Sequence, residues 1–226
     1  MPPDPSPIND GFLSFAGSNS HPSGPLLAGP MLGEVGETFA RVWVQARDTS
    51  PLALILHAPE GDVIVDAGAE PEKILGVTRA PVAAILVTHG HADHVDALEY
   101  VRRETGAPVY MHPADAEGKV RGYEPLEDGQ ALDVAGLGIR VLHTPGHSPG
   151  SVTFVVGHDQ IVGDLILPGS VGRTDIQGAS WEEIEVSIRR VIPLWEEETR
   201  LYTGHGPVLM AVEELRTNPY LPPGLS

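Results

Sequence analysis

Short apolar segments separated by turn residues dominate the first half of the chain. Segments with the length and alternation of strands lie at 39–45, 52–56 and 63–66. Because turn residues such as Glu60-Gly61-Asp62 join them, these strands predict a β-meander. The apolar run 82–87 indicates a buried strand, and the stretch 94–101 after it has the apolar spacing of a helix.

The second half of the chain repeats this order of strands and helices. Further strands are predicted near 108–111, 130–134, 139–143, 152–156, 160–162 and 199–203. A short helix is expected after Pro113, because proline suits the first helical position. A longer helix is expected after Ser180, because Ser180 and Glu183 have the spacing of a capping box. We therefore expect sheets with helices on their outer faces, in two similar halves.

The N-terminal segment lacks this patterning. It is dense in proline, glycine and serine, as in Ser20-His21-Pro22-Ser23-Gly24-Pro25, and shows no sustained period. We interpret residues 1–36 as an irregular arm. A chain of 226 residues can bury a substantial core in one domain, which we place at 37–226.

Charge and composition narrow the function classes. The 14 basic and 31 acidic residues give a formal charge of -17, which opposes binding to nucleic acid. No apolar run approaches the roughly 20 residues that a membrane span needs. The N-terminus also lacks the basic and apolar regions of a signal peptide. We therefore expect a cytoplasmic protein that acts on a small molecule, with neither nucleic acid nor membrane as a partner.

The chain contains no cysteine. Disulfides, thiolate nucleophiles and every zinc site with a cysteine ligand are thereby excluded. Any metal ion must be held by histidine, carboxylate and water.

The loop Thr88 to Asp96, which reads T-H-G-H-A-D-H-V-D, is the strongest candidate for chemistry. Residues two apart in an extended backbone share a face, so His89 and His91 can converge on one ion. Asp93 and His94 start the predicted helix, and their side chains can turn toward a second ion. Imidazole and carboxylate ligands suit zinc, and also iron or manganese.

Three later residues share the placement of this loop at the end of a predicted strand. His147 lies in a turn between prolines and glycines, Asp164 follows Gly163, and His205 stands between two glycines. Small flanking residues allow the backbone to approach a site closely. These three residues are therefore candidate ligands as well.

Between about Leu52 and Pro219 the chain resembles the metallo-β-lactamase fold superfamily, in particular short bacterial members of its glyoxalase-II-like branch. The motifs are His89-x-His91-x-Asp93-His94, Thr144-Pro145-Gly146-His147, Gly163-Asp164, Gly172-Arg173-Thr174-Asp175, Thr203-Gly204-His205-Gly206-Pro207 and Asn218-Pro219. The resemblance implies a four-layer αβ/βα sandwich of the α/β class, with two mixed β-sheets and helices on the outer faces. Residues 37–226 would form its catalytic domain.

The resemblance also implies a binuclear metal site. It assigns His89, His91 and His147 to one metal, Asp93, His94 and His205 to the other, and Asp164 to both. Two divalent ions, preferably zinc, would then share a hydroxide that attacks the substrate. Asp164 and Asp93 would be the catalytic carboxylates, with Asp93 also able to take a proton.

Three further residues each allow two interpretations. Asp66 matches a family position that supports the metal loop, or it is an ordinary turn aspartate. His143 is either a hydrogen-bond donor behind the ligands or a satisfied core group. Arg173 borders the family's substrate entrance and would hold a substrate carboxylate, or it only pins its own loop through Asp175.

The implied activity is hydrolysis of a thioester or a related ester. Glyoxalase II uses a C-terminal helical domain and tyrosines to hold glutathione, and this chain departs from that pattern after His205 and in the segment 172–175. One alternative is a persulfide dioxygenase, in which a single iron is held by residues like His89, His147 and Asp164. A metal-binding protein without catalysis is a further alternative.

Overall fold

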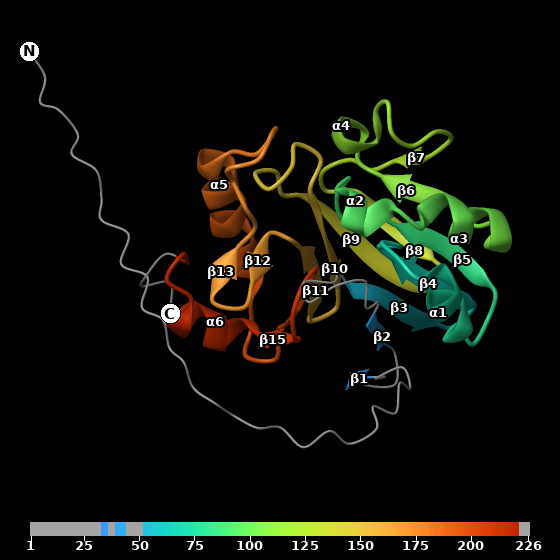
Figure 1. The fold of residues 1–226 in the computed structure, drawn as a ribbon. Coiled ribbons are helices and arrows are strands. Elements are labelled where there is room, and N and C mark those ends of the chain that lie inside the picture. The colour runs from blue at the N-terminus through green and yellow to red at the C-terminus, as the bar shows by residue number, and fades with distance from the viewer. Residues whose placement is uncertain (1–32, 36–38, 44–51, 222–226) are drawn as a thin grey trace, which may run out of the picture.

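Seven strands form the first sheet, in the order β1-β2-β3-β4-β5-β6-β7. They are β1 (Gly33–Val35), β2 (Phe39–Trp43), β3 (Leu52–Ala58), β4 (Gly61–Val65), β5 (Val82–Leu86), β6 (Val109–Met111) and β7 (Glu124–Pro125). Strands β1 to β4 pair antiparallel and include the expected meander, whereas β4 to β7 pair parallel. The computed structural model describes residues 33–35, 39–43 and 52–221 (Figure 1).

Six strands form the second sheet, in the order β15-β14-β11-β10-β9-β8. They are β8 (Ala131–Val134), β9 (Leu137–His143), β10 (Val152–Val156), β11 (Asp159–Gly163), β14 (Arg200–Thr203) and β15 (Leu209–Met210). Only the β11–β14 pair in this sheet is parallel. A small hairpin, β12 (Ile166–Leu167) and β13 (Ser170–Val171), stands apart. Both large sheets are therefore mixed, as the resemblance implies.

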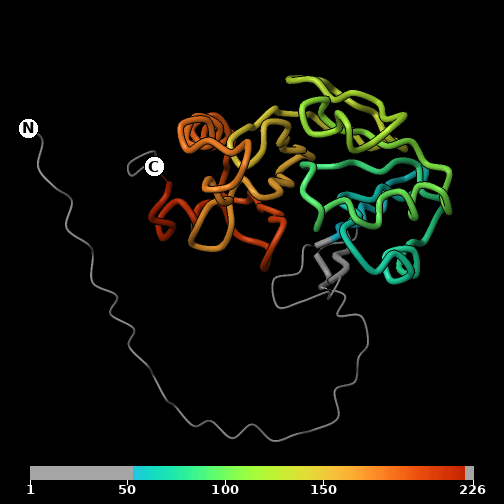
Figure 2. Tube along the Cα trace, turned by 45° about the horizontal axis from the view of Figure 1, so that its top comes forward, coloured from blue at the N-terminus to red at the C-terminus, as the bar shows by residue number. Residues whose placement is uncertain are grey.

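The helices cover the two outer faces. They are α1 (Pro71–Gly76), α2 (Ala92–Val95), α3 (Leu98–Thr105), α4 (Pro113–Ala116), α5 (Trp181–Val191), the 3-10 helix η1 (Ile192–Leu194) and α6 (Ala211–Thr217). Figure 1 shows α1 and α3 beside the first sheet and α5 and α6 beside the second. In Figure 2 the cyan-to-green and the orange-to-red parts of the chain lie side by side. Among the described residues, no helix is long and apolar enough to cross a membrane.

Three apolar clusters separate the four layers. Ile74 of α1 and Leu98 of α3 pack on one face of the first sheet, the second cluster fills the space between the sheets, and Ile184 of α5 packs on the outer face of the second sheet. The αβ/βα sandwich is thereby confirmed.

Strand β4 shows why this arrangement follows from the sequence. Its residues are buried throughout, with Ile64 facing the helices while Val63 and Val65 face the second sheet. Side chains alternate between the faces of a strand, so a continuous apolar run fits a sheet covered on both sides. Replacing a fully buried residue such as Ile64 by alanine would cost about 2–5 kcal/mol.

The single helix predicted over 94–101 is wrong in detail, because two helices occupy this region. Helix α2 ends at Val95 and α3 begins at Leu98. The backbone N–H of Ala97 donates to the carbonyl oxygen of Ala67 at 2.9 Å instead of to the preceding helical turn. This long-range bond separates the ligand-bearing helix α2 from the packing helix α3.

The predicted cap of α5 is confirmed in one half. The Ser180 hydroxyl accepts from the Glu183 N–H at 3.2 Å. The Ser180 N–H, which a full capping box would pair with Glu183, donates to the carbonyl of Gly146 at 2.8 Å. The start of α5 is thus tied to the turn that carries His147.

The N-terminal arm was expected to reach residue 36. Strand β1 pairs with β2, so the first strand within the described residues is at Gly33–Val35, before the expected start near Phe39. The expected irregularity of 1–32 lies outside the described residues.

Candidate metal centre

All the ligands assigned by the resemblance meet at one edge of the two sheets. They are His89 and His91 after β5, Asp93 and His94 in α2, His147 after β9, Asp164 after β11 and His205 after β14. Strand β5 belongs to the first sheet and the other three strands to the second. The site therefore exists only because the two sheets pack face to face.

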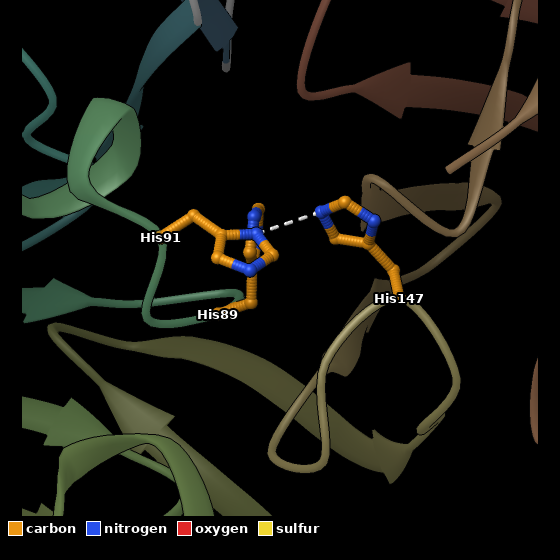
Figure 3. Close-up of side chains that lie close together, drawn as sticks. All are labelled: His89, His91 and His147. Carbon is orange, nitrogen blue, oxygen red and sulfur yellow. Dashed lines mark hydrogen bonds between the residues drawn. The ribbon is translucent and has the colours of Figure 1, made fainter. Parts of the chain in front are cut away.

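We call His89, His91 and His147 the first group. One nitrogen from each ring lies within 4.8 Å of the others. The closest pair is His91 Nδ1 and His147 Nε2, at 2.8 Å, and Figure 3 shows the rings pointing toward one another. Three imidazole nitrogens aimed at one point are an arrangement that suits a divalent ion.

Burial favours the neutral form of two imidazoles of the first group, His89 and His91. It lowers the pKa of His89 well below its ordinary value, and the nearby His94 adds to this effect. Burial also lowers the pKa of His91, with His147 as the next cause. Neutral imidazole is the form that binds metal, because its free lone pair is the donor.

Asp66 orients two of the imidazoles. Its Oδ2 atom contacts Nδ1 of His94 at 2.8 Å and accepts from the Thr88 hydroxyl at 2.7 Å. Since the Thr88 hydroxyl donates to Asp66, it accepts from Nδ1 of His89 at 3.1 Å. In their neutral forms, His89 and His94 then carry the hydrogen on Nδ1 and leave Nε2 free toward the site. The position of Asp66 matches its expected role behind the metal loop.

We call Asp93, His94 and His205 the second group. His205 Nε2 lies 3.3 Å from Asp93 Oδ2, and His94 Nε2 lies 4.0 Å from the same oxygen. The side chain of Asp93 is 49% exposed and that of His205 is 23% exposed, whereas His94 is fully buried. The second group is therefore the side of the site that faces solvent.

Asp164 lies between the groups. Its Oδ2 atom is 3.3 Å from His147 Nε2 and 3.5 Å from His205 Nε2, and its Oδ1 atom is 3.6 Å from His94 Nε2. One carboxylate thus contacts a histidine of the first group and two of the second. This is the geometry expected of a ligand shared by both groups.

The second group favours positive charge. Burial by itself lowers the pKa of His205. The interactions with Asp164 and Asp93 outweigh burial, so the pKa of His205 is raised to about 10. Burial likewise lowers the pKa of His94, but Asp66, Asp164 and Asp93 together outweigh this, so the net pKa is raised. Burial raises the pKa of Asp164, yet the hydrogen bond to His205 and nearby histidines bring it well below its usual range. The carboxylates that stabilise a protonated histidine here would also suit a divalent cation.

The unpaired polar atoms of the site fit bound metal. Among the described residues, His89 Nε2, His94 Nε2 and Asp164 Oδ1 are buried without a hydrogen-bond partner. Leaving such groups unsatisfied costs about 1–3 kcal/mol each. All of them belong to clusters whose donor atoms lie within 4.8 Å of one another. A divalent metal satisfies them, so the residues present fit the cofactor that the ligand pattern predicts.

Two glycines allow the backbone to close around Asp164. A Cβ atom on Gly204 would collide with Oδ1 of Asp164 and lie 2.7 Å from Cε1 of His94. A Cβ atom on Gly172 would collide with the Asp164 carbonyl and lie 2.8 Å from Nδ1 of His147. Glycine is therefore required next to these ligands for steric reasons.

His143 contacts backbone and non-ligand side chains among the described residues. Its Nε2 atom lies 2.9 Å from the carbonyl oxygen of Pro149, and its ring stacks on His112 with centroids 4.1 Å apart. It supports the turn after His147 through the backbone. This contact accommodates both sequence interpretations, since His143 is satisfied and also braces a ligand turn.

Arg173 is engaged by its own loop. Its guanidinium, 70% exposed, forms two hydrogen bonds to Asp175, at 2.9 and 3.0 Å. Its backbone carbonyl lies 3.0 Å from Nδ1 of His147 and accepts a hydrogen bond from that ring. The backbone of Arg173 thus orients a first-group ligand, and a role of its side chain in substrate binding stays a prediction.

Sequence reasoning missed Thr88 and Asp115. Thr88 connects Asp66 to His89, and Asp115 is a buried aspartate that contacts both ligand loops. An aspartate in the first turn of a short helix, such as Asp115, carries no signal of its own in the sequence. The one available signal for Thr88 is its position directly before His89.

The comparisons with known proteins agree with the site. The family model described as "Metallo-beta-lactamase superfamily" matches residues 47–205. The chain is 35% identical over 195 residues to "Probable metallo-hydrolase YqgX" of Bacillus subtilis, covering 75% of this chain and 91% of that protein. It is 27% identical over 194 residues to "Hydroxyacylglutathione hydrolase GloC" of Haemophilus influenzae, covering 75% of this chain and 91% of that protein.

Two solved structures are also similar. TTHA1623 in a di-iron-bound form has 38% identity and a TM-score of 0.70, covering 79% of this chain and 98% of that chain. ETHE1 from Myxococcus xanthus has 27% identity and a TM-score of 0.72, covering 80% of this chain and 83% of that chain. Fold, donor set and similarity agree: the chain belongs to the metallo-beta-lactamase superfamily, among its metallo-hydrolases.

Proposed function

We propose that the protein hydrolyses a thioester of a small molecule, using two divalent metal ions that share Asp164. The observation that carries this proposal is the position of Asp164, which contacts His147 of the first group and His205 of the second. The relative named as a hydroxyacylglutathione hydrolase supports the thioester as the substrate class. The absence of cysteine in the chain fits a reaction without a thiolate nucleophile.

In this proposal His89, His91 and His147 hold one ion, and Asp93, His94 and His205 hold the other. Bound divalent ions supply a water of lowered pKa and polarise the substrate carbonyl. We propose zinc, because imidazole and carboxylate donors without cysteine suit it, and iron and manganese fit the same donors. The di-iron form of TTHA1623 supports two ions in a related site.

Asp93 is suited to move a proton. Its hydrogen bond to His205 lowers its pKa, so the carboxylate is ionised at neutral pH. Of the two candidate catalytic carboxylates, Asp93 is the more exposed, at 49% against 9% for Asp164. Oδ2 of Asp93 can therefore accept a proton from attacking water and pass it to the departing thiolate.

Arg173 is the proposed contact for the far end of the substrate. Its guanidinium is exposed and pairs with exposed Asp175. A substrate carboxylate can compete for such a pair, because exposed ion pairs are worth about 0–1 kcal/mol. This would favour an anionic acyl thioester over a neutral one.

A second candidate activity is the oxidation of a persulfide by one iron ion. The segment Gly172-Arg173-Thr174-Asp175 and the similarity to ETHE1 favour it. The complete second group favours the hydrolase, since a single iron at the first group and Asp164 has no need of it.

One experiment separates these activities and the non-catalytic alternative. The protein is purified without added metal, its ions are counted, and it is assayed with S-lactoylglutathione, with simpler acyl thioesters and for persulfide-dependent oxygen uptake. Two ions per chain with thioester cleavage support the proposal. One iron with oxygen uptake contradicts it, and full metal content without any turnover indicates a metal-binding protein.

A further inference from the structure

A buried carboxylate outside the ligand set joins the two loops that carry the first group. Asp115 lies in α4, the short helix after β6 (Figure 1), and is 2% exposed. Its Oδ2 atom accepts from the Gly90 N–H at 2.7 Å and from the Ser148 hydroxyl at 2.5 Å. Its Oδ1 atom accepts from the Gly150 N–H at 2.8 Å. Gly90 lies between two ligands, and Ser148 follows the third.

The packing around Asp115 agrees with these hydrogen bonds. A Cβ atom on Gly90 would lie 2.8 Å from the Asp115 carbonyl oxygen. A Cβ atom on Gly150 would lie 2.7 Å from Cβ and Cγ of Asp115. Both loops therefore use glycine where they close on Asp115, and no side chain fits between them and the carboxylate.

The segment around α4 holds both backbone polar groups of Gly90. Asp115 accepts from its N–H, and the ammonium group of Lys119 donates to its carbonyl oxygen at 3.1 Å. The residue between His89 and His91 is thus fixed from both sides. Small errors in ligand position weaken metal binding strongly, so fixing Gly90 would strengthen the binding of an ion by His89 and His91.

The charge of Asp115 also favours a cation in the first group. Two backbone N–H groups and one hydroxyl, all of them neutral, donate to its carboxylate among the described residues. Its negative charge therefore acts on its surroundings. Consistent with this, Asp115 raises the pKa of His91, although burial and His147 lower it by more.

We propose that Asp115 is a positioning residue that sets the distance between the His89–His91 loop and the His147 turn, and thereby the affinity of the first group for metal. The bonds that span 33 and 35 residues connect α4, beside the first sheet, to the turn that follows β9 of the second, and the bond that spans 25 residues connects α4 to the His89–His91 loop. This inference rests on the metal centre of the proposed function, but not on its substrate.

The test uses Asp115→Asn with Asp62→Asn as the matched control. Asparagine has the same shape, but its NH₂ group must face at least one of the three donors. Asp62 is also buried, at 1% exposed, and also binds three partners: Nδ1 of His57 at 2.8 Å and the N–H groups of Arg79 at 2.5 Å and Ala80 at 3.2 Å. It lies near the start of β4, at the opposite end of the sheet from the ligands.

Both substitutions are made in a His205→Ala background, where the second group is incomplete. Metal-free protein is titrated with Zn²⁺ against a chromophoric chelator, and the absorption spectrum of the Co²⁺ form reports ligand geometry. We expect Asp115→Asn to weaken Zn²⁺ binding about 10–100-fold and to alter the Co²⁺ spectrum. The Asp62→Asn protein should bind Zn²⁺ within about threefold of its parent, below the range for residues that support ligands.

Equal affinity in folded Asp115→Asn and its parent, or an equal loss in Asp62→Asn, overturns the inference. The backbone bond from the Val152 N–H to the Thr88 carbonyl, at 2.8 Å, still joins the loops, so we expect the variant to fold. If it does not, Ser148→Ala removes one donor and keeps the charge, and an unchanged Zn²⁺ affinity there overturns the inference instead. A wild-type protein that binds zinc but cleaves no thioester contradicts the proposed function and leaves this test intact.

Discussion

The two ligand groups of the metal centre differ in their donor types, in the pKa values of their histidines and in their exposure to solvent. The first group is made of imidazoles only, and burial lowers the pKa of His89 and of His91. The second group contains Asp93, and its hydrogen bonds with Asp93 and Asp164 raise the pKa of His205 to about 10. The first group is the more buried and has two imidazoles of lowered pKa, whereas the second contains a carboxylate and a histidine of raised pKa and is partly open to solvent.

This difference teaches how a single site can treat its two ions unequally. Metal entering the first group meets imidazoles that Thr88 and Arg173 orient, and burial favours the neutral form of His89 and His91. Metal entering the second group must displace protons that the carboxylates hold in place. We therefore expect the ion in the first group to bind more tightly, with Asp164 coupling the two.

The largest effect is expected from Asp164→Asn, which removes the charge that both groups share. Metal content should fall at both positions, and thioester cleavage should drop by at least about 100-fold. Elemental analysis after dialysis and a steady-state assay check this. Asp159→Asn is the control, because Asp159 is also buried but pairs with Arg200 away from the site. Full metal content and rate in Asp164→Asn would show that the groups do not share this carboxylate.

The next largest effect separates the groups. His91→Ala should lose the first ion, and His205→Ala should lose the second while the first remains bound. The measurement is the number of ions per chain retained after dialysis against a weak chelator. Because the first group is enclosed, His205→Ala should retain close to one ion and His91→Ala less. The reverse order would contradict the ranking of the two groups.

A smaller effect is expected in the number of protons that each group releases when metal binds. Since His205 has a raised pKa of about 10 in the metal-free chain, it carries a proton at pH 7 to 8, which metal must release. Proton release at the first group should be smaller, because burial lowers the pKa of His89 and of His91. Acidification should therefore weaken the second ion first. Titration calorimetry in buffers of different ionisation enthalpy counts the protons, and equal release from both steps would remove the proposed contrast.

The smallest effect is expected at Thr88. Thr88→Val removes the hydroxyl that links Asp66 to His89, and the first ion should bind about 10-fold more weakly. Thr88→Ser keeps the hydroxyl and should bind nearly as the wild type does. Competition titration with Zn²⁺ compares the two variants. Equal affinities would mean that packing alone orients His89.

Much of the fold could be predicted from the sequence, because strands buried on both faces leave a strong signal. The runs 52–56, 63–66 and 82–87 became β3, β4 and β5, and the Ser180 signal became the cap of α5. Helices α1 and α6 were missed. Each is only a turn or two long, and α1 buries Ile74 as its one core residue.

The part of the site whose residues lie close together in the sequence could be predicted. His89, His91, Asp93 and His94 share one short loop, and His147, Asp164 and His205 were candidates because each follows a predicted strand beside small residues. The resemblance supplied the metal that each residue would hold. The contacts of Asp115 were out of reach, since they span 25 to 35 residues and depend on how the sheets pack. The break between α2 and α3 has a similar origin in the bond from Ala97 to Ala67.

The central claim is that one carboxylate, Asp164, is shared by two metal ions. The most direct test is a crystal structure of the zinc-loaded protein, with anomalous diffraction measured at the zinc edge. We expect two anomalous peaks, roughly 3.5–4 Å apart, one at each group, with Asp164 between them. A single peak, or two peaks with Asp164 bound to neither ion, would contradict the account.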